Sequence, residues 1–572
     1  MGGRVIPSGG VVLRAVTDPR ARRRHGIRGR IAPMSAPGPV ARTVDRLATR
    51  VLGLPGARTG YTVRTERVPV RDGVVLLATH LAPDTAHPLG TVLVRTPYGR
   101  RSPLDVVSAR TLAARGYHVL VQSCRGTFGS GGVFEPMVHE VDDGLDTVAW
   151  LRGQDWFDGR LATAGLSYLG WTQWALMTDP PPELKASVVV VGPHDFAEVT
   201  HGRGAFTLDD FLGWSAMMAV QEVGGPLRRA ARSLTGRPAL RRAHAGLPLV
   251  DAGEALLDGG APWYRDWASH PDRNDPFWEP RRVTAALERT TAPVLLVGGW
   301  QDLFLDQTLH QYAVLRGRGA PVALTVGPWT HLQVAVAADV ARETLQFVDQ
   351  HLAGVGARPS PVRIHVTGAG QWRDLPEWPP PTAARTWHAA AGGALLPDGV
   401  AVPAPATRFR FDPTDPTPTV GGRLLAAGAG VRDNAALEAR PDVVAFTGEP
   451  LAADLEVVGE PTVELDHSTD NPHADVFVRL CDVDAGGRSR NVTDVLLRLD
   501  PDRGPGPVRL TLDACAHRFA AGHRLRLLVA GGSHPRFARN LGTGEPAAGS
   551  SRTAPSVHTV TGARLTLPAV GP

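Results

Sequence analysis

The feature that most constrains the fold is a series of short, almost unbroken apolar runs, most of them followed by helix-like segments. Runs of this kind are typical of parallel strands, which are buried on both faces because their connecting helices cover the sheet. We therefore predict an α/β protein with a mainly parallel sheet. The runs are TVLVRTPYG (91–99), YHVLVQSCRG (117–126), LATAGL (161–166), KASVVVVGP (185–193), APVLLVGGWQD (292–302) and PVALTVGPWTH (321–331).

The apolar runs divide the chain into regions, since 572 residues are too many for one hydrophobic core. We predict that residues 56–194 and 290–356 form one domain around this parallel sheet. Residues 195–289 interrupt it with helix-like segments and aromatic side chains, so we expect an inserted helical lid. Residues 357–572 contain short alternating strands and turn residues without a long helix, which predicts a β-sandwich of the jelly-roll type.

The first 55 residues carry the one local excess of basic side chains, ARRRHGIRGR (21–30). Prolines interrupt the stretch that follows, so it lacks the continuous apolar core of an export signal. We expect residues 1–55 to be an extension that is disordered at least in part, with Met34 as an alternative start. We also expect a cytoplasmic protein that binds neither nucleic acid nor membrane.

Cysteine usage gives no sign of a metal site or a disulfide framework. Cys124, Cys481 and Cys515 are far apart in the chain and lack the spacing of zinc ligands. We expect no metal and no organic cofactor.

Ser167 lies where an apolar strand meets a helix-like segment, in LATAGLSYLGWTQW (161–174). Gly165 and Gly170 flank it in a Gly-x-Ser-x-x-Gly pattern. Small residues at these positions allow a sharp strand-to-helix turn that exposes the serine hydroxyl. Ser167 is therefore our candidate nucleophile.

A serine nucleophile needs a histidine base that a carboxylate orients. Reactive groups in a parallel sheet gather at the carboxyl ends of the strands. Asp302 and His331 directly follow two consecutive strands, in the order Ser, Asp, His. Asp306, one helical turn after Asp302, is a rival for the acid, but a helix start would direct it elsewhere. We therefore predict Ser167, Asp302 and His331 as a catalytic triad.

Two tyrosines can donate hydrogen bonds to the oxyanion that forms during acyl transfer. The backbone N–H of Tyr168 directly follows the nucleophile. The phenol of Tyr98 follows the first parallel strand, and a phenol stays protonated at neutral pH. From the residues alone, Tyr168 is a predicted donor, whereas Tyr98 fits a donor and an ordinary packing side chain equally well.

The chain resembles the CocE/NonD serine hydrolases of the X-Pro dipeptidyl-peptidase superfamily, and most closely the cocaine-esterase members. The resemblance extends from about residue 61 to near the end of the sequence. It rests on RTPYGR (95–100), SCRGTFGSGG (123–132), WFDGRLATAGLSYLGWTQW (156–174), FLGWSAMMA (211–219), SHPDRNDPFW (269–278), VGGWQD (297–302), VGPWTH (326–331) and QWRDLPEWPPP (371–381).

The resemblance implies an α/β-hydrolase domain, an inserted lid and a carboxy-terminal jelly roll that packs over the active site. It also implies that Tyr98 and Tyr168 together form the oxyanion hole. It assigns Phe304 and Trp214 to the substrate pocket, as walls around the acyl group.

Where α-amino-acid ester hydrolases carry ammonium-binding carboxylates, this chain has Leu303, Phe304 and Leu305. An α-amino group would lose its hydration there without gaining a partner, which disfavours that activity. In the lid, Asp209 and Asp210 are candidates for an anionic anchor, although a helix start favours a capping role.

We therefore predict a serine hydrolase that cleaves carboxylic esters, less readily amides, through an acyl-enzyme. The alternatives are an X-Pro dipeptidyl-peptidase that releases N-terminal dipeptides, or a non-catalytic ligand-binding protein. The expected substrate is a small ester or a short peptide. The sequence leaves a monomer and a homodimer both open.

Overall fold

The computed structural model describes residues 35–101, 103–223, 226–400, 406–425, 428–504 and 506–571. The basic run and Met34 lie outside the described residues. Within the predicted N-terminal extension, the structure describes residues 35–55, which contain helix α1 (Pro39–Val51). This helix begins with proline at its first turn, where a missing backbone N–H costs nothing.

A ten-stranded sheet forms the hydrolase domain, in the order β1-β2-β4-β3-β5-β6-β7-β8-β9-β10. The pairs from β4 through β8 are parallel, as the apolar runs predicted, and β9 also pairs in parallel with β8. Strands β1, β2 and β10 pair antiparallel. The strands are β1 (Tyr61–Pro69), β2 (Val75–Pro83), β3 (Thr91–Thr96), β4 (His118–Ser123), β5 (Leu161–Leu166), β6 (Leu184–Val190), β7 (Val294–Gln301), β8 (Val322–Thr330), β9 (Val362–Val366) and β10 (Gln371–Leu375).

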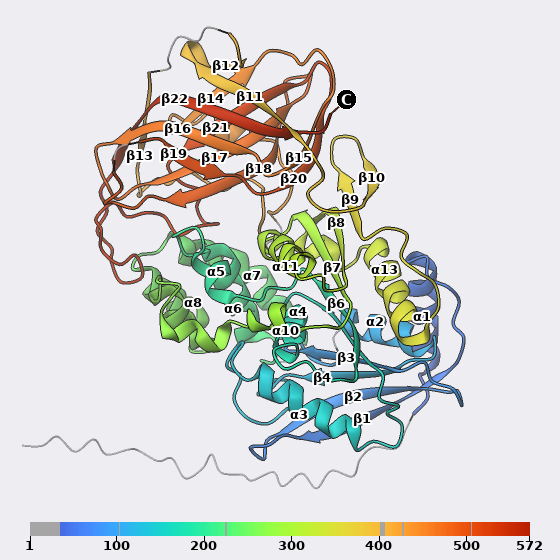
Figure 1. The fold of residues 1–572 in the computed structure, drawn as a ribbon. Helices are drawn as coiled ribbons and strands as arrows, with labels where there is room; N and C mark the ends of the chain where they lie inside the picture. The colour runs from blue at the N-terminus through green and yellow to red at the C-terminus, as the bar shows by residue number, and fades with distance from the viewer. Residues whose placement is uncertain are drawn as a thin grey trace, which may run out of the picture.

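Helices cover both faces of this sheet (Figure 1). Successive strand residues point to opposite faces, so Val188 and Leu295 belong to one buried cluster and Val189 and Leu296 to another. The first cluster lies under α2 (Pro103–Ala113) and α13 (Ala338–Val348), and α1 packs against α2. The second lies under α3 (Glu140–Arg152), α4 (Tyr168–Leu176), α10 (Ala285–Arg289) and α11 (Leu305–Gly317).

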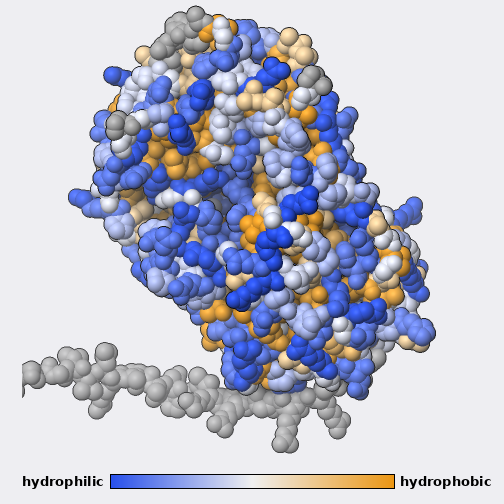
Figure 2. Space-filling model, viewed as in Figure 1, coloured by the Kyte–Doolittle hydropathy of each residue, from blue (hydrophilic) through white to orange (hydrophobic). Residues whose placement is uncertain are grey.

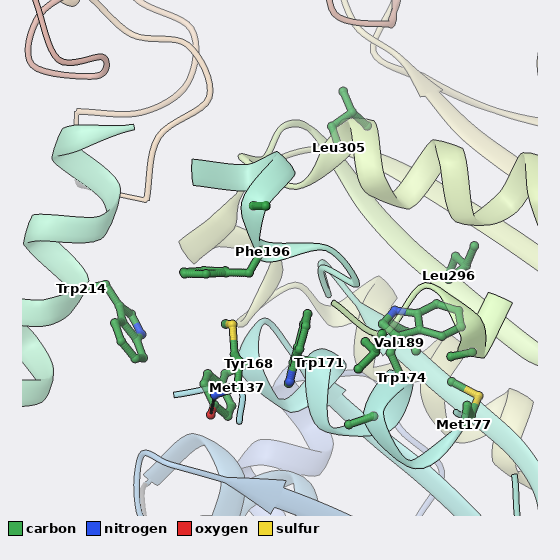
Figure 3. Packing of buried hydrophobic residues seen from close by; sticks show 14 of the residues in the cluster. Met137, Tyr168, Trp171, Trp174, Met177, Val189, Phe196, Trp214, Leu296 and Leu305 are labelled. Carbon is green, nitrogen blue, oxygen red and sulfur yellow. Dashed lines mark hydrogen bonds between the residues drawn. The ribbon is translucent and has the colours of Figure 1, made fainter. Parts of the chain in front are cut away.

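The predicted lid is helical and enters the chain between β6 and β7. It contains α5 (Phe196–His201), α6 (Leu208–Val220), α7 (Pro226–Ala245), α8 (Leu249–Leu257) and α9 (Trp263–Ser269). Aromatic contacts bind these helices together, such as Trp267 against Phe196 with ring centroids 4.5 Å apart. The rings reach the hydrolase domain, where Trp214 of α6 lies beside Tyr168 of α4 (Figure 3).

The carboxy-terminal part is a β-sandwich that lies above the hydrolase domain in Figure 1. The long strand β22 pairs with β11, β13, β15 and β16, and apolar side chains fill the space between the layers. Its strands are β11 (Ala383–Ala390), β12 (Ala394–Pro397), β13 (Thr407–Phe411), β14 (Val443–Gly448), β15 (Leu455–Gly459), β16 (Thr462–Thr469), β17 (Asp475–Val483), β18 (Ser489–Arg498), β19 (Val508–Thr511), β20 (Cys515–Phe519), β21 (Arg524–Ala530) and β22 (Ser556–Ala569).

The boundary of this domain differs from the predicted residue 357. Strand β9 pairs in parallel with β8, and β10 pairs with β9, so residues 362–375 extend the hydrolase sheet. The sandwich begins only with β11. Short strands with alternating apolar and polar residues look alike in the sequence whichever sheet they join. The alternation shows which face of a strand is buried, but it does not show which strand is its hydrogen-bonding partner.

Ion pairs join the two domains and the lid. Arg423 of the sandwich domain contacts Asp306 of α11 at 2.8 Å and Asp513 at 2.5 Å. Arg203, at the end of α5, contacts the same two carboxylates at 2.7 and 2.8 Å.

Hydrophilic residues, with scattered apolar ones, cover the face of the molecule seen in Figure 2. Among the described helices, none is both long and apolar enough to cross a bilayer.

Candidate active site

Ser167 lies between the end of β5 and the start of α4, in a strained backbone conformation. Its φ of 61° and ψ of −122° are rare for a residue with a side chain. The neighbouring glycines make this turn possible, because a Cβ at Gly165 would lie 2.4 Å from the Cβ of Leu169. A Cβ at Gly170 would lie 2.6 Å from the Cα of Gly192. The Gly-x-Ser-x-x-Gly pattern is therefore required by close backbone packing around the serine.

Asp302 and His331 lie together at the carboxyl ends of β7 and β8. The His331 Nδ1 and the Asp302 Oδ1 are 2.5 Å apart. Asp302 is 0% exposed and also accepts a hydrogen bond from the Phe304 N–H at 2.9 Å. A carboxylate bonded in this way fixes the imidazole with its Nδ1 protonated and leaves Nε2 as the basic nitrogen. Thr330 adds a capping box at the start of the short helix α12 (His331–Val334), which holds the histidine backbone in place.

The rival acid Asp306 has different partners. Its carboxylate oxygens accept hydrogen bonds from Arg203 and Arg423, at the junction with the sandwich domain. The helix start thus directs Asp306 away from His331.

Ser167 and His331 line one small cavity of about 30 Å³. Tyr98, Tyr168, Trp214 and Phe304 line the same cavity, so the structure brings the predicted nucleophile, base, oxyanion-hole and pocket residues together. The Phe304 ring lies edge-on to the His331 imidazole, with centroids 5.3 Å apart. An acyl group of more than a few atoms would have to displace some of these side chains.

Tyr98 and Tyr168 have different hydrogen-bond partners. The Tyr98 hydroxyl accepts a hydrogen bond from Trp214 Nε1 at 3.1 Å, so Trp214 orients this hydroxyl and also lines the cavity. Tyr168 is the first residue of α4, where a backbone N–H has no acceptor within the helix. Its ring stacks on Trp214, and its hydroxyl donates to the buried Glu140, 2.5 Å distant. Burial raises the pKa of Glu140 to about 7.

Sequence reasoning missed part of the cavity wall. Trp267 and Phe211 could have been suspected from the aromatic content of the lid, but no local signal points to Leu425 of the sandwich domain. Only the packing of the domains places Leu425 there. The missed lining residues are Met137, Pro193, Phe196, Phe211, Trp267 and Leu425.

None of the described residues that line this cavity carries a carboxylate. Asp209 faces His244 of α7, with 3.6 Å between the carboxylate oxygen and Nε2. Asp210 is buried behind the wall, where its Oδ1 accepts the N–H of Leu425 at 2.6 Å and its Oδ2 has no partner among the described residues. Burial and the neighbouring Asp209 raise the pKa of Asp210 to about 8. Both carboxyl groups therefore hold the lid in place rather than line the site.

Replacing Asp210 by asparagine should flatten the dependence of stability on pH. A carboxyl whose pKa is raised by folding binds its proton more tightly in the folded state, so stability falls as pH rises from about 4 to about 8. One such group lowers the free energy of unfolding by at most about 1.4 kcal/mol for each pH unit of increase. We expect the melting temperature of the wild type to drop more than that of Asp210→Asn between about pH 5.5 and about pH 8.5.

Asp251→Asn, at an exposed carboxylate of α8, is the matched control and should behave like the wild type. Parallel pH profiles for the wild type and Asp210→Asn would contradict the assignment.

Known proteins share both the sequence and the architecture of this chain. The family profile of the X-Pro dipeptidyl-peptidase (S15 family) matches residues 72–333. That of the X-Pro dipeptidyl-peptidase C-terminal non-catalytic domain matches residues 353–565. Cocaine esterase from Rhodococcus sp. (strain MB1 Bresler) is 29% identical over 531 residues, which cover 83% of this chain and 92% of the esterase.

Solved structures show the same fold. An α-amino acid ester hydrolase superposes with a TM-score of 0.75 at 23% identity, covering 90% of this chain and 98% of its own. A CocE/NonD family hydrolase from Staphylococcus aureus superposes with a TM-score of 0.64 at 17% identity, covering 89% of this chain and 94% of its own. The two profiles match in order along the sequence, so the chain combines an X-Pro dipeptidyl-peptidase (S15 family) domain with the C-terminal domain of those enzymes, and it is a serine hydrolase.

Proposed function

We propose that the protein hydrolyses carboxylic esters at Ser167 through an acyl-enzyme. The observation that carries the proposal is that Ser167 and His331 line one cavity while the buried Asp302 bonds to the far side of the imidazole. A neutral serine needs an imidazole base that a carboxylate orients, and His331, oriented by Asp302, lines the same cavity as Ser167.

In the proposed reaction, the Ser167 Oγ attacks the ester carbonyl as His331 Nε2 takes its proton. The negative charge on the carbonyl oxygen is stabilised by the Tyr98 hydroxyl and the Tyr168 backbone N–H. The protonated imidazole then gives its proton to the departing alcohol, which leaves an acyl group on Ser167. Water, deprotonated by His331, releases the acid and restores the serine.

Replacing Tyr98 by phenylalanine should lower kcat by about 10²- to 10³-fold, because one oxyanion donor is lost. KM should change little, since the ring remains in the pocket beside Trp214. The measurement is steady-state hydrolysis of p-nitrophenyl butyrate. Tyr117→Phe is the matched control, because that buried hydroxyl bonds to Asp349 rather than facing Ser167. Equal losses in the two variants would contradict a role for Tyr98 in the oxyanion hole.

The apolar wall favours esters without a free ammonium group. The residues after Asp302 are Leu303, Phe304 and Leu305, and the first two line the cavity. A substrate ammonium would lose its water there without gaining a counter-charge. The sequence similarity to a cocaine esterase supports a carboxylic ester as the substrate.

The alternative is release of N-terminal dipeptides after proline, which the S15 family profile favours. We expect p-nitrophenyl butyrate to be hydrolysed with a higher kcat/KM than Ala-Pro-p-nitroanilide. The reverse preference would replace the ester proposal by the dipeptidyl-peptidase one. A fluorophosphonate probe should label the wild type, and failure to label would favour a non-catalytic ligand-binding protein.

A further inference from the structure

A second and larger cavity of about 450 Å³ lies on the α2 and α13 side of the sheet. Its volume falls within the roughly 300–1,000 Å³ of ordinary small-molecule sites. Helix α1 forms one wall and the sheet forms the opposite one, and these elements lie together in Figure 1. Its lining is mostly apolar, including Val44, Leu47, Leu166, Leu169, Val340 and Leu345.

The apolar stripe of α1 faces this cavity without being covered by packed side chains. Val40, Val44, Leu47 and Val51 recur four, three and four residues apart, and their exposed fractions run from 41% to 78%. An amphipathic helix normally buries such a stripe against its domain.

Polar contacts, rather than buried apolar side chains, tether α1. Tyr61 donates a hydrogen bond to Asp45 at 2.6 Å, and Arg342 donates to the Leu52 carbonyl at 3.3 Å. No residue of α1 is buried. The helix is therefore held over the cavity at a distance that leaves room between its apolar face and the sheet.

One cation lines this apolar space. Arg115, just after α2, is 2% exposed. Its guanidinium donates to the carbonyl oxygens of Thr111 and Pro55, but its Nε has no partner among the described residues. No carboxylate of the described part of the chain lies within ion-pair distance of it. Buried charges are normally paired, because leaving water is costly.

We propose that this cavity binds a monocarboxylate with an alkyl chain, whose carboxylate pairs with Arg115. The alkyl chain of the ligand would lie between the apolar stripe of α1 and the sheet, and would cover both. A free fatty acid and an apolar acid released from an ester share this chemistry. The site is separate from the Ser167 cavity, although Gly165, Leu166 and Leu169 line it from behind the Ser167 turn. The proposal does not depend on the proposed ester hydrolysis.

Isothermal titration of the full chain with sodium decanoate tests the proposal, with decan-1-ol and sodium butyrate as partial ligands. The wild type should bind decanoate, and should bind the alcohol and the short acid more weakly, because each lacks either the charge or the chain. Arg115→Met should weaken decanoate binding about tenfold or more and leave decan-1-ol binding unchanged.

A second variant keeps the test decisive if Arg115→Met is unstable. Ala48→Trp, on the cavity side of α1, should fill the space and abolish binding of both ligands. Arg46→Met and Thr43→Trp, at exposed positions of the same helix, are the matched controls and should bind as the wild type does.

Two results would overturn the proposal. One is a wild type that does not bind decanoate. The other is binding that survives Ala48→Trp and is instead prevented by labelling Ser167 with a fluorophosphonate, which would place the acid in the Ser167 cavity.

Discussion

Ser167→Ala is expected to lower the turnover of p-nitrophenyl butyrate by about 10⁴-fold or more. Without the hydroxyl no acyl-enzyme can form, and His331 has no proton to accept. The fold should be unaffected, because the Ser167 side chain makes no hydrogen bond to the other described residues. Alanine meets the same backbone strain at a φ of 61° as serine does. The melting temperature should therefore stay close to that of the wild type.

The matched control is Ser551→Ala, at an exposed serine far along the chain in the sandwich domain. Prepared in parallel, it should retain full activity and label with a fluorophosphonate, whereas Ser167→Ala should do neither. If Ser167→Ala keeps residual turnover, and added fluorophosphonate inhibits that turnover in proportion to its amount, another residue is the nucleophile.

The α/β fold and the convergence of the candidate site could be predicted because both follow from local pattern. Apolar runs buried on two faces identify parallel strands, and parallel strands present their carboxyl ends at one edge. Residues that directly follow these strands must then lie near one another. Asp302 and His331 satisfy this rule, and so does Ser167.

Features that depend on packing between distant segments could not be predicted. Leu425 lies at the cavity wall because the Asp210 carboxylate and the Arg203–Asp513 ion pair fix the sandwich domain against the lid. Strands β9 and β10 have the alternating pattern of the sandwich, yet their hydrogen bonds extend the other sheet. Helix α1 carries a clear amphipathic stripe, but sequence alone does not show what that stripe faces.

Asp302→Asn should lower kcat by about 10⁴-fold, the size of loss found for the corresponding exchange in serine proteases. An asparagine can present its NH₂ group to His331 Nδ1. The imidazole would then carry its proton on Nε2 and could not accept one from Ser167. The amide oxygen of the new side chain can still accept the Phe304 N–H, so the turn after β7 should persist. A lower kcat at an almost unchanged melting temperature is the expected outcome.

Asp306→Asn is the matched comparison, because this carboxylate lies one helical turn further and was the rival for the same role. Loss of the negative charge weakens the contacts of residue 306 to Arg203 and Arg423. A hydrogen bond to a charged group contributes about 1.5–3 kcal/mol to the free energy of unfolding. We therefore expect a lower melting temperature, with kcat of the folded enzyme within about tenfold of the wild type. If Asp306→Asn instead lost activity as Asp302→Asn does, with its stability intact, Asp306 would be the orienting acid. The two variants thus separate a carboxylate that orients a base from one that joins two domains.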